Sequence, residues 1–253
     1  MLTDSSNGYT VDFNTYTGRA AGQTIGGHGL GYDVVIHLIA PYFGKGYQFF
    51  VDNFYSTFTL FKHLYDQGVV ATGTILDSRC SFPRALKNSK EWAKGQEQGS
   101  MRWVRDPPCL VLQWVDNEVV FMTTTVGNAN EKGQVTGRVR ADGEWVETLV
   151  KQPQIFKTYK MKMNGVDRSD QILSAFSTRW KCVQWWKTLL TTAISVRRKN
   201  SFILFQAHRA EHTEIERPVG YSQCDFCYKI VREIRGLEVY GDPPTYNPGG
   251  QRA

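Results

Sequence analysis

The chain has 253 residues, of which 41% are hydrophobic and 21% are charged. These values are typical of soluble globular proteins and exclude a wholly disordered chain, a collagen and a coiled coil. The 30 Lys and Arg residues exceed the 24 Asp and Glu residues by a net charge of +6, and the longest apolar stretches fall well short of the ~20 residues that a membrane span needs, so no membrane partner is expected.

The N-terminal part of the chain combines a turn, a strand, a loop and a helix. Residues 4–8 form a good turn sequence, and residues 9–16 show a β-type pattern that predicts a strand. This strand is expected to pair in hairpin fashion with one that lies at or before Met1. Residues 22–31 are rich in glycine but lack the P-loop pattern, so they predict a flexible loop and not a phosphate cradle. Residues 32–41 predict a helix whose inward side chains are Val34, Val35, Leu38 and Ile39.

The clearest unit of the chain is a predicted strand, helix and strand. Residues 47–51 are aromatic and β-branched, which predicts a buried strand. A helix over residues 57–67 is expected to begin at a side-chain cap, either Ser56 or Thr57. Residues 69–76 predict the second strand. Two strands that are joined by a helix through short connections form a βαβ crossover, so the sheet contains parallel strands.

Residues 77–150 differ in texture and predict a separate, β-rich insertion. Residues 111–125 are expected to form two strands joined by a turn at Asp116 and Asn117. Four tryptophans are expected to supply the local cores of the insertion: Trp92, Trp103, Trp114 and Trp145.

Residues 151–217 combine helical patterns with the positive charge of the chain. This quarter contains 13 Lys and Arg residues against 5 Asp and Glu residues, whereas the rest of the chain contains 17 against 19. Such a surplus is the electrostatic footprint expected of a phosphate-backbone partner, and a solvated basic helix face is the alternative. A long helical region is expected from Asp167 to His208. Residues 218–253 are expected to be loop-like, with a disordered tail over residues 241–253.

Aspartates at the ends of predicted elements are the candidate chemical groups. Asp52 follows a predicted strand at the edge where open α/β sheets bind ligands, although an aspartate there is also an ordinary turn signal. Asp167 and Asp170 lie three residues apart on one face of a predicted helix, where capping of the helix is the alternative role. Asp4 lies in a turn sequence and has the same ambiguity.

Such a set of carboxylates, contributed by separate elements, suits a divalent metal site. Mg²⁺ binds a few carboxylate oxygens, keeps several waters and accepts phosphate oxygens. Two such ions about 3.5–4 Å apart activate a water or a 3′-hydroxyl in phosphodiester cleavage and stabilise the leaving oxygen. Aspartates beside a basic helix are consistent with this chemistry, with Mg²⁺ or its substitute Mn²⁺ as the cofactor.

Several motifs make the chain resemble the piggyBac transposases. Residues 52–57 (Asp-Asn-Phe-Tyr-Ser-Thr), with Gly-Thr-Ile at 73–75, are similar to the second-aspartate motif of that family. Residues 164–171 (Asn-Gly-Val-Asp-Arg-Ser-Asp-Gln) are similar to its third-aspartate motif. The helix with Trp-Trp-Lys at 185–187 and the stretch Asn-Ser-Phe-Ile-Leu at 200–204 resembles the segment after the third-aspartate motif in family members.

Asp4, with Tyr9 and residues 16–19 after it, resembles the first-aspartate neighbourhood of the same family, so the similarity covers roughly residues 4–208. The resemblance implies an α/β fold with a mixed sheet and a ribonuclease-H-like core, which a β-rich insertion interrupts before the helix that bears Asp167. Family members carry a long N-terminal region, whereas this chain begins three residues before Asp4. An N-terminally truncated core is therefore expected. The implied division is residues 1–76 and 151–217 for the core, 77–150 for the insertion and 218–253 for the remnant of a cysteine-rich tail.

The resemblance also implies a function and its site. It implies a DDD-type, Mg²⁺-dependent transposase that cuts and joins DNA at TTAA target sites in the nucleus, with no small-molecule substrate. Asp4, Asp52 and Asp167 would then form the metal-binding triad, and Asp170 would be an accessory carboxylate one helical turn on. A homodimer is expected only where the upstream region is present.

The pair Cys224 and Cys227 resembles the opening of the C-terminal zinc module of the family. A tetrahedral zinc site needs four ligands, and no Cys or His follows Cys227. His208 and His212 precede the pair with i,i+4 spacing and offer one way to complete a zinc site, while a truncated remnant is the alternative. Five cysteines are an odd and small number, and the start of the chain lacks signal-peptide features, so a reduced, intracellular protein is expected.

Basic and aromatic side chains of the helical region are the candidate DNA contacts. Trp185 and Trp186 suit stacking on bases, although tryptophans at helical spacing are also typical of a core. The basic run at 197–199 suits phosphate contacts or nuclear import, and a solvated helix face is the alternative. The residues expected to hold phosphates are Lys181, Lys187, Arg197 and Arg198.

Two functions from different classes remain open on the sequence. The first is a transposase catalytic domain that cleaves and transfers DNA strands with a divalent metal. The second is a domesticated or truncated derivative that binds DNA or a partner without cutting. A gene fragment without a stable fold is a third alternative.

Overall fold

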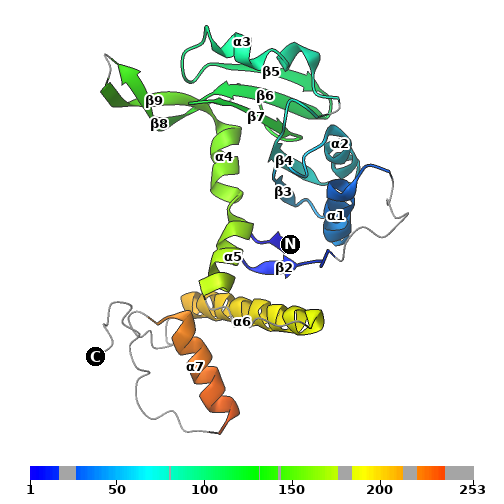
Figure 1. Cartoon of the computed structure of the whole chain (residues 1–253), viewed down its shortest axis with the longest axis vertical. Coiled ribbons are helices and arrows are strands. Elements are labelled where there is room, and N and C mark those ends of the chain that lie inside the picture. Colours follow the sequence, from blue (N-terminus) through cyan, green and yellow to red (C-terminus); the bar gives the residue numbers. More distant parts are fainter. Residues whose placement is uncertain are drawn as a thin grey trace. The chain divides into compact units, whose positions relative to one another are not determined.

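The computed structural model describes residues 1–16, 27–79, 81–130, 132–141, 144–175, 184–212 and 221–236. The chain divides into two units. Figure 1 labels their helices and strands. The sheet unit comprises residues 1–6 and 11–164, and the helical unit comprises residues 7–10 and 165–253. None of the helices in the described ranges combines the length and the apolar character that a membrane crossing requires.

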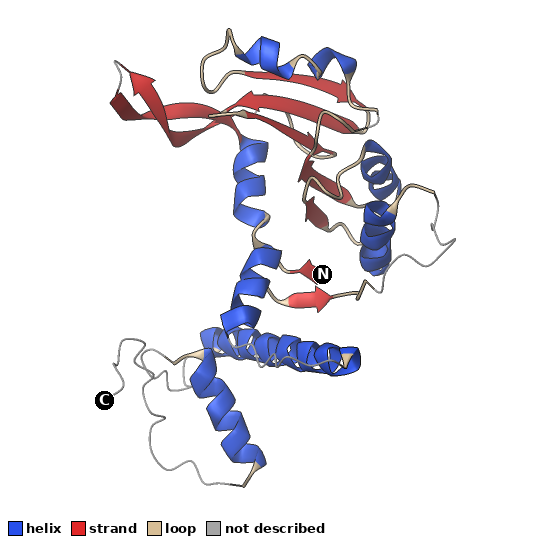
Figure 2. Cartoon of the chain, viewed as in Figure 1, coloured by secondary structure: helices blue, strands red, loops and turns tan. Residues whose placement is uncertain are grey.

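A five-stranded mixed sheet forms the centre of the sheet unit, in the order β3-β4-β7-β6-β5 (Figure 2). β3 and β4 run parallel and are connected through a helix, so the predicted βαβ crossover is confirmed. β7 pairs antiparallel with both β4 and β6, which makes the sheet mixed. The strands are β3 (Gln48–Val51), β4 (Val70–Thr74), β5 (Met101–Asp106), β6 (Cys109–Val115) and β7 (Val119–Thr124).

Helices of the sheet unit bury the faces that their sequence patterns predict. In α2 the Thr57 hydroxyl accepts a hydrogen bond from the backbone N–H of Leu60 at 3.2 Å, which caps the helix as expected. In α1 the side chains of Val35, Leu38 and Ile39 are buried, whereas Val34 is only half-buried. The helices are α1 (Leu30–Ile39), η1 (Ala40–Tyr42), α2 (Phe58–Asp66), η2 (Arg84–Leu86), α3 (Ser89–Ala93) and α4 (Gln154–Lys162).

Three strands of the expected insertion continue the core sheet instead of standing apart. β6 is buried at every position, and its Val111 shares a core cluster with Leu60 of α2. Because β4 is itself buried, it needs a neighbour on each side, and β7 is that second neighbour. Trp114 is buried as expected, but Trp103 is 45% exposed and supplies no core. The assignment of residues 77–150 to an insertion stays a prediction.

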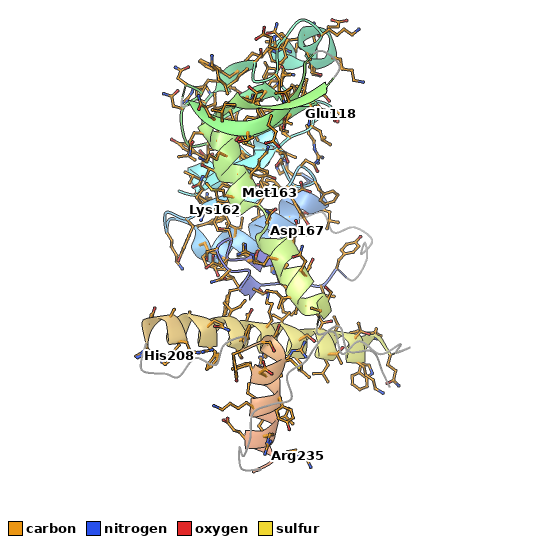
Figure 3. All side chains as sticks on the ribbon, turned by 90° about the vertical axis from the view of Figure 1, so that its left-hand side faces the viewer. Glu118, Lys162, Met163, Asp167, His208 and Arg235 are labelled. Carbon is orange, nitrogen blue, oxygen red and sulfur yellow. The ribbon has the colours of Figure 1, made fainter. Side chains whose placement is uncertain are left out.

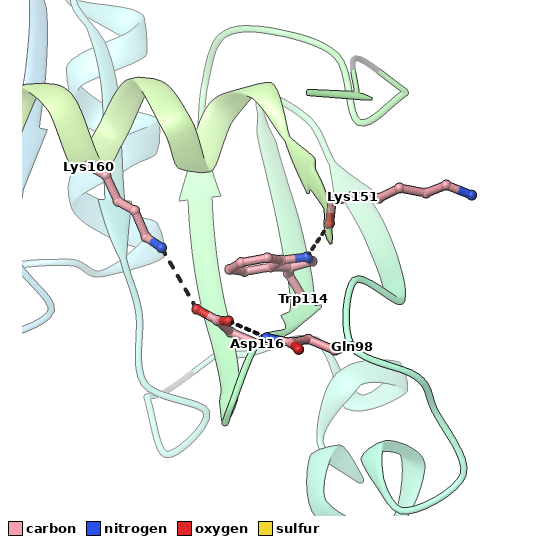
Figure 4. A network of polar contacts seen from close by, with 5 residues as sticks. All are labelled: Gln98, Trp114, Asp116, Lys151 and Lys160. Atoms are coloured by element: carbon pink, nitrogen blue, oxygen red, sulfur yellow. Dashed lines mark hydrogen bonds and ion pairs between the residues drawn. The ribbon is translucent and has the colours of Figure 1, made fainter. Parts of the chain in front are cut away.

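A hairpin outside the core sheet leads into α4. Its strands are β8 (Lys132–Ala141) and β9 (Glu144–Pro153). Polar contacts fix this junction to the sheet (Figure 4). The indole N–H of Trp114 donates to the carbonyl oxygen of Lys151 at 2.9 Å, and Asp116 joins the amide of Gln98 at 3.0 Å to the ammonium of Lys160 at 3.8 Å. These contacts therefore hold the end of β9 and the last turn of α4 to the sheet.

The N-terminal strand pairing differs from the expectation. β1 (Leu2–Thr3) and β2 (Thr10–Asp12) form a two-stranded sheet, so the partner of β2 lies after Met1 and not at or before it. The pattern over residues 9–16 overstates the strand, because Asp12 binds the next backbone N–H through its own carboxylate. Of the glycine-rich stretch, residues 22–26 lie outside the described residues.

The helical unit contains α5 (Gly165–Ala175), α6 (Trp185–Glu211) and α7 (Gln223–Ile234). α5 and α6 overlap the long helical region that the sequence predicts, but α7 lies where a loop is expected. Ser222 and Asp225 form a reciprocal capping box at the start of α7. Phe226 packs against Phe205 of α6 with ring centroids 5.1 Å apart, which gives α7 an apolar partner. The expected disordered tail, residues 241–253, lies outside the described residues.

Candidate active site

Asp52 lies on a sharp, hydrogen-bonded turn at the carboxyl end of β3. Its side chain is exposed, while its backbone carbonyl oxygen accepts bonds from the N–H groups of Tyr55 at 3.0 Å and Ser56 at 3.1 Å. The buried Ser56 hydroxyl donates to the same oxygen at 3.0 Å. Three donors on one carbonyl oxygen fix the backbone of Asp52. The side chain that carries the carboxylate is therefore attached to a rigid main chain.

Gly73 of β4 lets this turn approach the neighbouring strand. A Cβ atom at this position would lie 2.5 Å from the carbonyl oxygen of Val51 and 2.6 Å from the hydroxyl of Ser56. No other residue fits there without movement of the backbone. The Gly-Thr-Ile sequence after the Asp52 motif is therefore explained by close packing against the Asp52 turn.

Two further side chains secure the same turn. The buried Tyr159 of α4 donates from its hydroxyl to the carbonyl oxygen of Val51 at 3.2 Å, and this hydroxyl lies 3.4 Å from that of Thr74. Burial raises the pKa of the Tyr159 phenol, so the hydroxyl stays protonated and keeps donating. Arg79 donates to the carbonyl oxygens of Asn53 and Phe54, both at 2.7 Å.

The carboxylate of Asp4 is held in its ionised form directly after β1. It accepts hydrogen bonds from the backbone N–H of Ser6 at 2.8 Å and from the Ser6 hydroxyl at 2.6 Å. The bonds from the Ser6 hydroxyl and backbone N–H lower the pKa of Asp4, burial opposes them, and the charge of Lys162 adds a smaller lowering. An exposed, ionised carboxylate is a ready metal ligand.

Asp167 and Asp170 project from α5, on which Figure 3 labels Asp167. Both side chains are exposed, and their i,i+3 spacing places them on one face of the helix. The helix begins at Gly165, so Asp167 is not its N-cap; it lies in the first turn, where the helix dipole favours a negative charge. The capping interpretation therefore does not hold for Asp167.

The predicted carboxylates are divided between the two units. Asp4 and Asp52 belong to the sheet unit, and Asp167 and Asp170 belong to the helical unit. Within the described part of the chain, no group of three or more His, Cys, Asp or Glu side chains is placed so that it could hold a metal ion. The predicted triad thus stays a prediction.

Exposed aromatic and basic side chains stand together on α6. Trp185 is 73% exposed and Trp186 is 49% exposed, so the interpretation of these two tryptophans as core residues is wrong. The Lys187 ammonium lies 5.4 Å from the Trp186 ring centroid. Arg197 is exposed and Arg198 is half-buried. Lys181, the remaining predicted phosphate contact, lies outside the described residues.

Lys199 is buried, although the sequence around it suggests an exposed basic residue. It stands in a run of three basic residues, yet its side chain is fully buried and hydrogen-bonded. Neither a phosphate contact nor a solvated helix face describes it. The spacing from the buried Val196 is the available signal, because residues three apart share a face of a helix.

Cys224 and Cys227 lie about one turn apart near the start of α7, and their predicted role in a zinc site stays a prediction. Burial raises the pKa of the Cys227 thiol, which disfavours the thiolate that binds zinc. His208 and His212 stack on one another with ring centroids 4.2 Å apart. Among the residues that the structure places, no third Cys or His completes a metal-binding group with these cysteines.

Comparison with known proteins identifies relatives over almost the whole chain. The sequence profile of the family described as Transposase IS4 matches residues 1–202. The human PiggyBac transposable element-derived protein 3 is 25% identical over 249 residues, which cover 96% of this chain and 40% of that protein. The human PiggyBac transposable element-derived protein 2 is 27% identical over 213 residues, which cover 81% of this chain and 34% of that protein. The chain thus spans less than half the length of these relatives.

A solved structure is also similar. The cryo-EM structure of the piggyBac transposase synaptic complex with hairpin DNA matches with a TM-score of 0.72 and 21% identity, over 97% of this chain and 48% of that one. This likeness supports the mixed α/β fold. The predicted resemblance is therefore confirmed by profile, relatives and fold together, and the chain belongs to the piggyBac family of transposases.

Proposed function

We propose that this chain is the catalytic part of a piggyBac-type transposase, which cuts and joins DNA strands at TTAA sites in the nucleus with a divalent metal. The observation that carries the proposal is the Asp52 turn. An exposed carboxylate stands at the carboxyl end of a parallel strand, where α/β sheets bind ligands, and several buried groups fix its backbone. Such rigid support is what a ligand residue requires, and an ordinary surface turn does not need it.

The donor set fits Mg²⁺ or Mn²⁺. In the proposal, Asp4, Asp52 and Asp167 hold the metal, and Asp170 is an accessory carboxylate. Exposed aspartate carboxylates are the oxygen ligands that these ions prefer, and the bonds from Ser6 keep Asp4 ionised. The metal, when bound, supplies activation of the attacking hydroxyl and stabilisation of the leaving oxygen.

The remaining residues of the proposal bind and orient the DNA. Lys181, Lys187, Arg197 and Arg198 hold phosphates, since the basic surplus of the chain lies in their region. The similarity to a transposase that was solved with hairpin DNA supports DNA as the partner. A ribonuclease-H-like core, interrupted by residues 77–150, is part of the same proposal.

The direct test of catalysis is nicking of a supercoiled TTAA-containing plasmid with Mg²⁺ or Mn²⁺. The wild type is expected to nick it, Asp52→Asn to lose the activity, and Asp66→Asn to keep it. Asp66 is a matched control, because it is an exposed aspartate at the end of α2 and outside the proposed site. Equal nicking by the wild type and Asp52→Asn would remove Asp52 from the mechanism.

A second candidate is a derivative that binds DNA or a partner without cutting. It is favoured by the human relatives, which are named as transposable element-derived proteins. Its signature is DNA affinity that falls steeply with salt and is unchanged in Asp52→Asn, together with no nicking by the wild type.

A further inference from the structure

The ammonium of Lys199 is a buried hub of the helical unit. It lies on α6, its side chain is 0% exposed, and it donates to the carbonyl oxygen of Gly8 at 2.8 Å and to the hydroxyl of Ser169 at 2.6 Å. Its third bond goes to the hydroxyl of Thr10. An ammonium has three donors, so all of them are used.

The next residue fastens the same N-terminal segment. The amide of Asn200 donates to the carbonyl oxygen of Thr10 at 2.7 Å, and the N–H of Thr10 donates to the amide oxygen of Asn200 at 3.0 Å. This side chain therefore pairs with both backbone groups of Thr10, as a neighbouring strand would. The segment Asn7–Thr10 is thus bound to α6 through two consecutive residues of that helix.

The same hub reaches α5 next to its carboxylates. Ser169 is fully buried, two residues after Asp167 and one before Asp170. A Cβ atom on Gly8 would lie 3.3 Å from the backbone nitrogen of Ser169, so the N-terminal segment also packs tightly against α5. Lys199 therefore joins α6, the Asn7–Thr10 segment and the acidic turn of α5 at one point.

A buried ammonium is a demanding way to join these elements. Burial of a charge costs free energy unless hydrogen bonds and an opposite charge compensate it, and apolar residues usually pack a helix interface more favourably. Burial lowers the pKa of Lys199 to about 8, while the charge of Asp170 acts in the opposite direction. Lys199 provides more than packing. Its three hydrogen bonds fix α6, the Asn7–Thr10 segment and α5 relative to one another.

We propose that Lys199 is a positioning residue, which holds the first turns of α5 so that Asp167 and Asp170 present their carboxylates in one fixed arrangement. The proposal rests on the proposed metal-dependent function, because it concerns the same carboxylates. Asp4 precedes the Asn7–Thr10 segment closely in the sequence, since only Ser5 and Ser6 lie between Asp4 and Asn7.

The test measures the full chain and the variants Lys199→Met, Lys199→Arg and Ser169→Ala. Lys229→Met is the matched control, because Lys229 is an exposed lysine of the same unit. Titration calorimetry with Mn²⁺ is expected to show a loss of affinity of about 10–100-fold for Lys199→Met, as for other residues that orient metal ligands, and a smaller loss for Lys199→Arg. Lys229→Met should bind Mn²⁺ as the wild type does.

A double-mutant cycle separates positioning from general stability. In the Asp167→Asn background, Lys199→Met is expected to cause little further loss of Mn²⁺ affinity, because the carboxylate that it orients is already gone. Additive losses in the two variants would overturn the proposal. If Lys199→Met gives no cooperative melt, Ser169→Ala carries the same cycle, since it removes a hydroxyl that contacts Lys199 and Thr10 and removes no charge.

Amide hydrogen exchange tests the role of Lys199 without any metal. Lys199→Met and Ser169→Ala are expected to raise amide exchange in α5 and in Asn7–Thr10 and to leave α7 unchanged. Unchanged exchange in α5, or an equal rise in all three segments, would overturn the proposal. A wild type that binds no Mn²⁺ would contradict the proposed function, and the exchange pattern would still decide the role of Lys199.

Discussion

Lys199 makes the stability of the chain depend on pH in a defined window. Its pKa falls from the usual 10.5 to about 8, first through burial and against the opposing charge of Asp170. Between these two values the unfolded chain binds more protons at this residue than the folded chain does. The free energy of unfolding therefore gains a contribution that rises with pH from about 8 to 10.5, and at lower pH the full penalty of the buried charge remains.

This contribution is visible as a difference between two proteins. Urea unfolding of the wild type and Lys199→Met, at several values between pH 7 and 10, is expected to show a steeper rise for the wild type. The difference in slope is at most about 1.4 kcal/mol per pH unit, the value for one proton. Parallel curves above pH 8 would contradict the assigned pKa, because every other titrating group is common to both proteins.

Gly73 is the residue whose side chain would most directly disturb the Asp52 turn. In Gly73→Ala the new methyl group would lie 2.5 Å from the carbonyl oxygen of Val51, so β3 and β4 must move apart. Overpacking of this kind costs about 1–3 kcal/mol or more. Thermal unfolding should show the loss for Gly73→Ala and none of comparable size for Gly95→Ala, where nothing lies within 4 Å of the added atom. Equal stabilities would refute the close approach.

At the scale of elements, Tyr159 is the link between α4 and the end of β3. Tyr159→Phe removes a buried donor and leaves the carbonyl oxygen of Val51 without it. The expected loss is about 1–3 kcal/mol of unfolding free energy, the cost of an unsatisfied buried polar group. Tyr47→Phe is the control, since Tyr47 is 52% exposed and its change should stay within about 0.5 kcal/mol. A loss no larger than that of the control would remove Tyr159 from the support of the turn.

The elements that the sequence predicts well are those with local signals. The strand, helix and strand around Asp52 arise from an apolar run, a capping Thr57 and a second apolar run, all within about thirty residues. The pairing of β7 with β4 joins strands whose residues lie about fifty positions apart, as Thr72 and Thr124 do, and no local pattern specifies it. The sequence alone therefore does not place β7 beside β4.

α7 is a different case, because its start signal is local. Ser222 and Asp225 have the spacing of a capping box. The usual pattern has Glu or Gln at the third position of the helix, so Asp225 makes the signal weaker. The apolar partner of α7 lies on α6, around Phe205. Because this partner is remote in the sequence, the local pattern of α7 contains only part of what stabilises the helix. The surrounding Pro and Gly residues favour the loop interpretation that the structure replaces.

At the scale of the whole molecule, the candidate site is only partly predictable. Sequence motifs identify Asp4, Asp52, Asp167 and Asp170, but they contain nothing on the groups that fix these residues. Arg79, Tyr159 and Lys199 are distant in sequence from the aspartates they support, and Lys199 is concealed in a basic run. Support of this kind is defined by tertiary contacts, which no local sequence pattern specifies.

DNA binding is a property of the whole charge distribution. Arg197 is an exposed member of the basic region, so Arg197→Gln is expected to weaken DNA binding similarly for all sequences. It should also reduce the slope of log affinity against log salt by about one phosphate contact. Fluorescence anisotropy over a series of salt concentrations measures both, with Lys229→Gln as the control. An unchanged slope for Arg197→Gln would place the DNA elsewhere.

The metal site proposed around Asp52 is tested by thermal unfolding of the wild type, Asp52→Asn and Asp66→Asn, each with and without Mn²⁺. A ligand that binds only the folded chain stabilises it by about 2.7 kcal/mol at a hundred times its dissociation constant, which raises the midpoint by several degrees. This rise is expected for the wild type and for Asp66→Asn, and no rise is expected for Asp52→Asn. A rise of equal size in all three proteins, or in none, would contradict a metal site built on Asp52.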